Sequence, residues 1–440
     1  MENKFLFGVS SSAFQIEGAS DIDGKGKSVW DTYCEISGKV HNGDSPKISA
    51  DHYHRYKEDV ALMKELGVNA YRFSISWSRV IPNGIGDINK KGIQFYINLI
   101  DELLKNDIEP VVTLYHWDLP QALQEKGGLQ NKDFPKWFLE YTKVVVAALK
   151  GKCNKFITFN EPINCVHSSY YSGVFAPGLK LSEEETFRCI VHMQLAHGLS
   201  AKYIRENIQN SLVSIAISTF EEYPLDNSKE CYDATVKRFF TRELIGESLD
   251  AYLDPIFLGK YPDYCYSRFP NVMKDLTSED INMMYQYTNY IGYNNYSGYP
   301  VDKNGSILDI NTKYKTCFNT PIDPNGFYWG VKILINRYHL PLIVTENGLG
   351  SNDDTISCDN KVHDKLRCIY FKEIFKKLGK LIIEGFDIRG YFVWSFTDNF
   401  EWISGYQPRF GLVFIDYQNN QKRIKKDSFA IYQKLIKNKN

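Results

Sequence analysis

Eight short runs of apolar and β-branched residues recur along the 440-residue chain, and each has the composition of a buried strand. They lie at residues 5–14, 70–77, 109–117, 155–162, 211–220, 290–297, 340–348 and 388–400. Between them lie stretches whose apolar residues recur with the 3.6-residue period of a helix, for example at 54–67, 90–106, 134–151 and 363–385. The pattern therefore predicts strands and helices that alternate along the chain.

This alternation favours a parallel sheet whose two faces are covered by helices. Eight such units predict an α/β fold that closes into a single (β/α)8 TIM barrel, the simplest architecture for the pattern. No linker or low-complexity tract divides the sequence, so we expect residues 1–440 to form one domain. The longer connections at 17–50, 168–182, 295–324 and 395–424 nearly all follow a predicted strand, and such extended loops gather over the C-terminal face, where active sites lie.

Composition narrows the expected partners and location. The 52 basic and 53 acidic side chains give a net charge of -1, which implies neither a nucleic-acid nor a membrane partner. The nine cysteines are scattered without paired spacing, as expected for free thiols in a reducing compartment. No apolar stretch has the length of a signal-peptide core near the start or of a membrane span elsewhere, so we expect a cytoplasmic protein.

Two glutamates follow the apolar cores of predicted strands. Glu161 lies in KFITFNEPIN between Asn160 and Pro162, and Glu346 lies near the end of LPLIVTENG. A single carboxylate at a strand end is more often a solvent contact before a turn. Two of them at the same end of parallel strands can converge across the barrel mouth, and paired carboxylates there suggest hydrolysis of a glycosidic bond.

Other strand ends carry side chains that suit a sugar, because amide, imidazole and carboxylate groups bind hydroxyls and indoles stack on the apolar face of the ring. These residues are Gln15, His116, Trp117, Asn294, Trp394, Glu401 and Trp402. Any one of these residues alone could have a purely structural role. His116 could be a hydrogen-bonded histidine of the core, and Trp402 could be a packing residue. Their shared place on one rim predicts a carbohydrate pocket.

Long motifs then place the sequence in a family. FGVSSSAFQIEGA, LYHWDLPQAL, TFNEP, VTENG, VWSFTDNFEW and RFGLVFIDY occur in order along nearly the whole chain. In these motifs the sequence resembles the family 1 glycoside hydrolases, typified by β-glucosidases. The resemblance implies a retaining β-glycosidase that hydrolyses terminal non-reducing β-D-glucosides, with β-galactosides, β-fucosides and short oligosaccharides such as cellobiose as further substrates. It implies a small-molecule substrate and no cofactor or metal, and it leaves the oligomeric state open.

The resemblance also implies a role for each matching position. Glu161 matches the general acid/base, Glu346 the nucleophile, and Asn160 the contact to the sugar 2-hydroxyl. Arg72 and Tyr296 match the residues that flank the nucleophile. The other substrate contacts that we expect are Gln15, His116, Trp117, Asn294, Glu401, Trp402 and Phe410, with Trp394 as the platform beneath the sugar ring.

The chemistry requires the two carboxyl groups to differ in protonation. A retaining mechanism places them about 5 Å apart, with one attacking the anomeric carbon while the other protonates the leaving oxygen. We expect the positive charge of Arg72 to hold Glu346 ionised. A less polar setting and the repulsion of Glu346 would keep Glu161 protonated.

Three alternative functions predict different residues at the site. A 6-phospho-β-glucosidase would replace the Glu401–Trp402 pair with small residues and carry a lysine and a tyrosine where Pro408 and Phe410 stand. A thioglucosidase typically replaces the acid glutamate by Gln, whereas Glu161 is present. A non-catalytic sugar-binding protein on this scaffold would lose a glutamate, and both are kept. The phospho-β-glucosidase and the binding protein stay open as alternatives.

Two positions depart from the family pattern. Asn295 stands where a second aromatic residue is usual, beside the site. The segment CFNTPIDPNG lacks the tryptophan that many members use as a platform for the leaving group, and Phe318 and Thr320 lie nearby. The preference for the leaving group therefore stays open.

Overall fold

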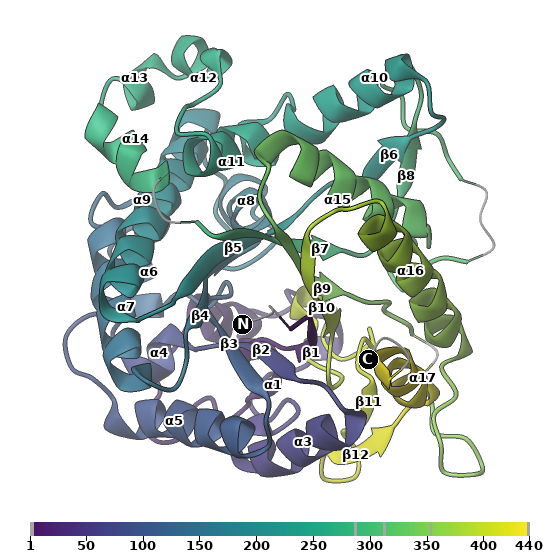
Figure 1. The fold of residues 1–440 in the computed structure, drawn as a ribbon. Helices are drawn as coiled ribbons and strands as arrows, with labels where there is room; N and C mark the ends of the chain where they lie inside the picture. The colour runs from purple at the N-terminus through teal and green to yellow at the C-terminus, as the bar shows by residue number, and fades with distance from the viewer. Residues whose placement is uncertain (1–3, 286–287, 311–313, 353, 438–440) are drawn as a thin grey trace.

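The computed structural model describes residues 4–285, 288–310, 314–352 and 354–437. At its centre a closed barrel of eight parallel strands runs in the order β1-β10-β9-β7-β5-β4-β3-β2 (Figure 1). Its strands are β1 (Leu6–Ser10), β2 (Ala70–Ser74), β3 (Glu109–Tyr115), β4 (Lys155–Asn160), β5 (Leu212–Ser218), β7 (Tyr290–Asn295), β9 (Leu342–Asn347) and β10 (Ile388–Trp394). Each strand lies inside one of the eight predicted runs, and the predicted (β/α)8 barrel is confirmed.

Helices surround the barrel, and four of them match the predicted helical stretches: α3 (His52–Leu66), α5 (Lys90–Lys105), α7 (Phe134–Leu149) and α16 (Lys365–Ile383) (Figure 1). The other helices of eight or more residues are α9 (Glu183–Asn207), α10 (Lys229–Phe240), α11 (Leu249–Phe257), α14 (Ser278–Tyr285), α15 (Pro324–Tyr338) and α17 (Asp427–Lys437). The shorter ones are α1 (Ala13–Ile16), α2 (Val29–Cys34), α4 (Trp77–Val80), α6 (Gln121–Gln124), α8 (Pro162–Val166), α12 (Asp263–Arg268) and α13 (Pro270–Met273).

Local sequence sets the ends of these helices. The long helix α9 begins at a capping box, in which the Ser182 hydroxyl accepts the backbone N–H of Glu185 and the Glu185 carboxylate accepts that of Ser182. Helix α3 ends at Gly67, whose φ of +86° is the left-handed conformation that glycine adopts without a steric penalty.

The barrel is filled by a small cluster that takes one buried residue from each strand: Leu6, Ala70, Val111, Ile157, Ala216, Tyr290, Ile343 and Phe392. Gly8 makes room for the Phe392 ring, because a Cβ atom at Gly8 would lie 2.3 Å from it. A second and much larger apolar cluster includes residues of the strands and of the surrounding helices. The barrel is therefore a packed core, and a ligand can enter only over its ends.

Two of the strands carry a β-bulge just before they leave the barrel. Between Ile157 and Asn160, β4 has one residue more than β5, and between Val344 and Asn347, β9 has one residue more than both β7 and β10. A bulge shifts the alternation of side chains by one residue and so redirects the side chains at the end of the strand. Each bulge lies beside a predicted functional glutamate.

Three of the four predicted connections, 168–182, 295–324 and 395–424, reach the C-terminal ends of the strands, and the end of 395–424 continues along helix α3 on the outside of the barrel, where Arg423 pairs with Asp59. The connections between the strands also contain two small sheets. Strands β6 (Glu222–Pro224) and β8 (Tyr299–Val301) pair in parallel, and β11 (Val413–Asp416) and β12 (Lys422–Lys425) form an antiparallel pair. The predicted connection at 295–324 includes residues 311–313, which lie outside the described residues. The segment between β5 and β7, which holds β6 and α10 to α14, was not singled out in the sequence and lies outside the strand ring (Figure 1).

Each connection leaves one barrel strand and leads to the next, so we propose that the chain forms a single domain. Within the described ranges, no helix combines the length and the apolar character that a membrane crossing demands.

Candidate active site

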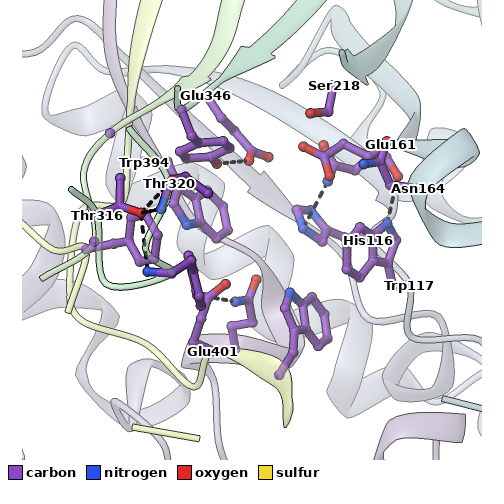
Figure 2. Close-up of a pocket in the computed structure, with 18 of the residues that line it drawn as sticks. His116, Trp117, Glu161, Asn164, Ser218, Thr316, Thr320, Glu346, Trp394 and Glu401 are labelled. Atoms are coloured by element: carbon purple, nitrogen blue, oxygen red, sulfur yellow. Dashed lines mark hydrogen bonds between the residues drawn. The ribbon is translucent and has the colours of Figure 1, made fainter. Parts of the chain in front are cut away.

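A cavity of about 370 Å³ opens at the C-terminal ends of the strands. Eleven of the residues that the sequence assigned to a site line it: Gln15, His116, Trp117, Asn160, Glu161, Tyr296, Glu346, Trp394, Glu401, Trp402 and Phe410. Figure 2 shows Glu161 and Glu346 on one side of this cavity and Glu401 on the other. The structure therefore brings the predicted residues together from strand ends and loops that are far apart in the sequence.

Glu161 occupies the single residue between β4 and α8, where Pro162 begins the helix. Its backbone is in the left-handed region, with φ of 43° and ψ of 56°, and its N–H donates to the carbonyl of Ala216 at 2.7 Å. Such a conformation is unfavourable for a residue with a side chain and recurs at functional sites. The amide of Asn294 donates to Glu161 Oε1 at 2.7 Å and fixes the carboxyl group in the cavity.

The environment of Glu161 favours its protonated form. Burial and then the nearby negative charge of Glu346 raise the pKa of Glu161 to about 8, although the Asn294 hydrogen bond acts in the opposite direction. Within the described part of the chain, no cation forms an ion pair with this carboxyl group. At neutral pH Glu161 is therefore able to donate a proton.

Glu346 has the opposite surroundings. Arg72 Nη1 lies 2.5 Å from Oε1, and the Tyr296 hydroxyl donates to Oε2, also at 2.5 Å. Burial raises the pKa of Glu346, but the Arg72 charge and the Tyr296 hydrogen bond oppose that rise. Because a charged partner contacts only this member of the pair, Glu346 is the carboxyl group that is suited to be ionised.

Asn160 connects the two glutamates. Its Oδ1 accepts from Arg72 Nη2 at 2.7 Å and from Asn294 Nδ2 at 3.1 Å, and its Nδ2 lies 3.1 Å from His116 Nε2. His116 Nε2 must then be the acceptor, which leaves the proton on Nδ1, an atom with no hydrogen-bond partner among the described residues. Burial lowers the pKa of His116 well below its usual range, so the ring is neutral.

The opposite wall combines polar groups with flat rings. Gln15 and Asn399 donate to Glu401 Oε2 at 3.3 and 2.8 Å. Burial raises the pKa of Glu401 to about 7. The rings of Trp117 and Trp402 stack with centroids 5.0 Å apart. Such a wall suits a ligand that has hydroxyl groups around its edge and an apolar face.

Asn294 and Arg72 are placed differently from the other predicted residues. The sequence places Asn294 on the rim as a contact for sugar hydroxyls, but its side chain is fully buried behind Glu161 and does not line the cavity. It accepts from the Thr345 hydroxyl at 2.6 Å while it donates to Glu161. The bulge in β9 sets Glu346 opposite Asn294, so the Asn294 side chain lies between the two glutamates and supports Glu161. Arg72 is buried in the same layer.

Several residues of the cavity wall are not among those predicted from the sequence: Asn164, Phe175, Ser218, Thr219, Glu221, Thr316, Gly348 and Gly350. Most of them come from irregular connections, which carry no periodic signal. Ser218, Thr219 and Glu221 follow the fifth predicted strand, so the same strand-end argument would have found them. Phe318 and Thr320 do line the cavity, whereas Asn295 is buried and does not.

Comparisons with known proteins agree with this geometry. The family model described as glycosyl hydrolase family 1 matches residues 1–440. Beta-glucosidase A of Thermotoga maritima is 38% identical over 440 residues, which cover 99% of this chain and 97% of that protein. A 1,4-beta-D-glucan glucohydrolase of Thermotoga neapolitana is 38% identical over 441 residues, with the same coverage.

Solved structures give the same result. The family 1 β-glucosidase from T. maritima superimposes with a TM-score of 0.90 at 37% identity and covers 100% of this chain and 98% of that one. The same T. maritima enzyme is also known in complex with glucoimidazole and with deoxynojirimycin. Sequence, fold and cavity together confirm the resemblance, and the chain belongs to glycosyl hydrolase family 1.

Proposed function

We propose that this protein is a retaining β-glucosidase that hydrolyses terminal non-reducing β-D-glucosides, with Glu346 as nucleophile and Glu161 as general acid/base. One observation carries the proposal. Two carboxyl groups share a cavity, but only Glu346 contacts a cation, whereas Glu161 is desolvated without one. This is the asymmetry that a double displacement needs.

In the first step, Glu346 attacks the anomeric carbon and Glu161 gives its proton to the leaving oxygen. Arg72 and Tyr296 hold the two oxygens of Glu346 in place. The bond between sugar and leaving group breaks, and a glycosyl ester forms on Glu346. Because the ester carries no charge, the repulsion that raised the pKa of Glu161 disappears, and Glu161 is left as a carboxylate.

In the second step, Glu161 takes a proton from a water molecule that attacks the anomeric carbon from the leaving-group side, and the ester bond to Glu346 breaks. The sugar leaves with its original anomeric configuration, Glu346 is again a carboxylate, and Glu161 is again protonated. Asn160 is fixed by Arg72 and His116 and retains an amide hydrogen for a substrate hydroxyl. We assign it to the sugar 2-hydroxyl, where a hydrogen bond that strengthens as positive charge develops on the ring stabilises the transition state.

We assign the wall of Gln15, His116, Glu401 and Trp402 to the other sugar hydroxyls, and Trp394 to the face of the ring. The names of the relatives, which include a β-glucosidase and a β-D-glucan glucohydrolase, support glucosides and short β-linked glucans as substrates. We also propose β-galactosides and β-fucosides as further substrates, because hydroxyl groups of either orientation can find a partner among several donors and acceptors on this wall.

Unphosphorylated β-glucosides should be hydrolysed at least about 100-fold faster than their 6-phosphates, because the Glu401 carboxylate repels a phosphate and no Lys or Arg lines the described cavity. Glu401→Ser should narrow this gap by removing the repulsion. The ratio of the kcat/KM values for 4-nitrophenyl β-glucoside and its 6-phosphate measures this preference in both proteins. Faster hydrolysis of the phosphate by the unmodified protein would establish the 6-phospho-β-glucosidase alternative instead.

The pH profile should report the proton on Glu161. Glycosylation needs this group protonated, so kcat/KM should fall as the pH rises through about 8. Asn294→Ala removes a donor that favours the ionised form, and the alkaline limb should therefore move to higher pH. Asn295→Ala is the matched control, because this neighbouring buried amide contacts neither glutamate. If the alkaline limb stays at the same pH in Asn294→Ala, then a group other than Glu161 causes the loss of activity at high pH.

We also propose a reducing compartment, such as the cytoplasm. All nine cysteines are free thiols, and Cys153, Cys165, Cys189, Cys231 and Cys265 are buried. Proteins of oxidising compartments tend to pair such residues in disulfides.

A further inference from the structure

The cavity is rich in carboxyl groups. Four carboxyl groups line it, those of Glu161, Glu221, Glu346 and Glu401, whereas no Lys or Arg of the described chain does. The proposed mechanism and the sugar wall use three of them. Glu221 has no part in either, and a carboxyl group in a ligand cavity without a role requires an explanation.

Glu221 is held rigidly at the cavity wall. It follows the end of β5 by three residues and has a left-handed backbone, with φ of +62°. Its Oε1 accepts the backbone N–H of Tyr296 at 2.5 Å, and its own carbonyl accepts the N–H of Tyr299 at 3.0 Å. These contacts join the ends of β5 and β7 and fix the direction of the side chain.

Glu221 lies beside the proposed acid/base, Glu161, and not beside the wall that we assign to the sugar hydroxyls. Glu161 donates its N–H to Ala216 of β5, and Ser218 at the end of β5 pairs with Asn294, the partner of Glu161. Figure 2 shows Ser218 near Glu161 and Glu401 across the cavity. The charge of Glu221 is close enough to contribute to the raised pKa of Glu161. Since Glu161 protonates the leaving oxygen, Glu221 lies on the side from which the leaving group departs.

The carboxyl group of Glu221 has capacity for a ligand. Burial raises the pKa of Glu221 to about 7, although the backbone N–H groups of Tyr296 and Ser297 act in the opposite direction, and no cation of the described residues forms an ion pair with it. An ammonium ligand therefore favours the ionised form of this carboxyl group. A carboxylate offers about four acceptor positions, so others stay available for a ligand. The same cavity is also lined by the hydroxyl groups of Thr219 and Thr316 and by the ring of Phe318, which is 48% exposed.

We propose that Glu221 recognises the leaving group and favours β-glucosides whose leaving group carries a protonated amine on an apolar body. The inference rests on the proposed function, because it assigns the leaving-group side from the role of Glu161. An ammonium group gains a charged hydrogen bond at Glu221 and attraction from the carboxyl-rich cavity, and Phe318 contacts the apolar body. A carboxylate on the leaving group is repelled by the same charges.

The test compares two substrates of similar shape, 4-(aminomethyl)phenyl and 4-(hydroxymethyl)phenyl β-D-glucoside. The ratio of their kcat/KM values should favour the amine in the unmodified protein, and Glu221→Gln should lower this ratio about tenfold. The variant keeps an oxygen for the Tyr296 N–H, so the wall is preserved. Glu243→Gln is the control, because it removes the same charge from an exposed residue outside the cavity and should leave the ratio unchanged.

A purely structural Glu221 gives a different result. If Glu221→Gln slows both substrates equally, the residue only anchors Tyr296 and the inference is wrong. Should the variant fail to fold, the ratio in the unmodified protein is measured at low and at high salt, where screening should reduce the preference for the amine. A constant ratio then contradicts the inference. If the unmodified protein does not hydrolyse 4-nitrophenyl β-D-glucoside, the proposed function itself is wrong.

Discussion

Glu346→Gln should lower kcat for 4-nitrophenyl β-D-glucoside by roughly 10⁵-fold or more, because the amide cannot attack the anomeric carbon. The amide oxygen can still accept from Arg72 or Tyr296, whose contacts hold the carboxylate at 2.5 Å, so the cavity should keep its shape. Activity is followed by release of 4-nitrophenol, and the fold by circular dichroism and thermal melting.

Two further variants separate chemistry from stability. Azide should restore turnover to Glu346→Gly and form the inverted α-glucosyl azide, because the small anion occupies the space of the missing carboxylate. Asp59→Asn is the matched control: Asp59 is also fully buried and paired with an arginine, Arg423, but lies outside the cavity. It should lower the melting temperature and leave kcat almost intact. Near-normal turnover in Glu346→Gln would contradict the assignment of the nucleophile.

Glu161→Ala should slow glycosylation by an amount that depends on the leaving group. 2,4-Dinitrophenolate departs without a proton, so its kcat/KM should change by less than about tenfold, whereas cellobiose should lose roughly 10³- to 10⁴-fold. Deglycosylation also slows, because water loses its base. The glycosyl ester on Glu346 should therefore accumulate, and the dinitrophenyl substrate should show a burst and a low KM.

Azide gives the complementary measurement for Glu161→Ala. It needs no base, so it should accelerate turnover and form the retained β-glucosyl azide, with the opposite anomeric configuration to the product expected from Glu346→Gly. Product analysis by NMR distinguishes the two azides. If Glu161→Ala slows every leaving group equally and azide has no effect, the left-handed backbone at Glu161 is only a feature of the turn and the acid lies elsewhere on the rim.

Much of this protein could be predicted before any coordinates. Eight apolar runs alternate with helical stretches along the chain. Such a pattern depends only on residues that are close in sequence, so it predicts all eight strands. The barrel follows from that alternation because parallel strands need covered faces. Strand-end position and long motifs together pointed to Glu161, Glu346 and most of the cavity wall.

The functional surroundings of these residues depend on contacts between distant parts of the chain. Arg72 and Glu346 are 274 positions apart, and nothing local in either segment indicates that they pair. Two bulges, in β4 and β9, shift the side-chain alternation beside Glu161 and Glu346, and the bulge in β9 sets Glu346 opposite Asn294 of β7. Glu221 joins the cavity through a backbone contact to Tyr296, 75 residues away. Register and long-range hydrogen bonds arise only when the barrel closes, because each depends on how one strand is aligned with its neighbour.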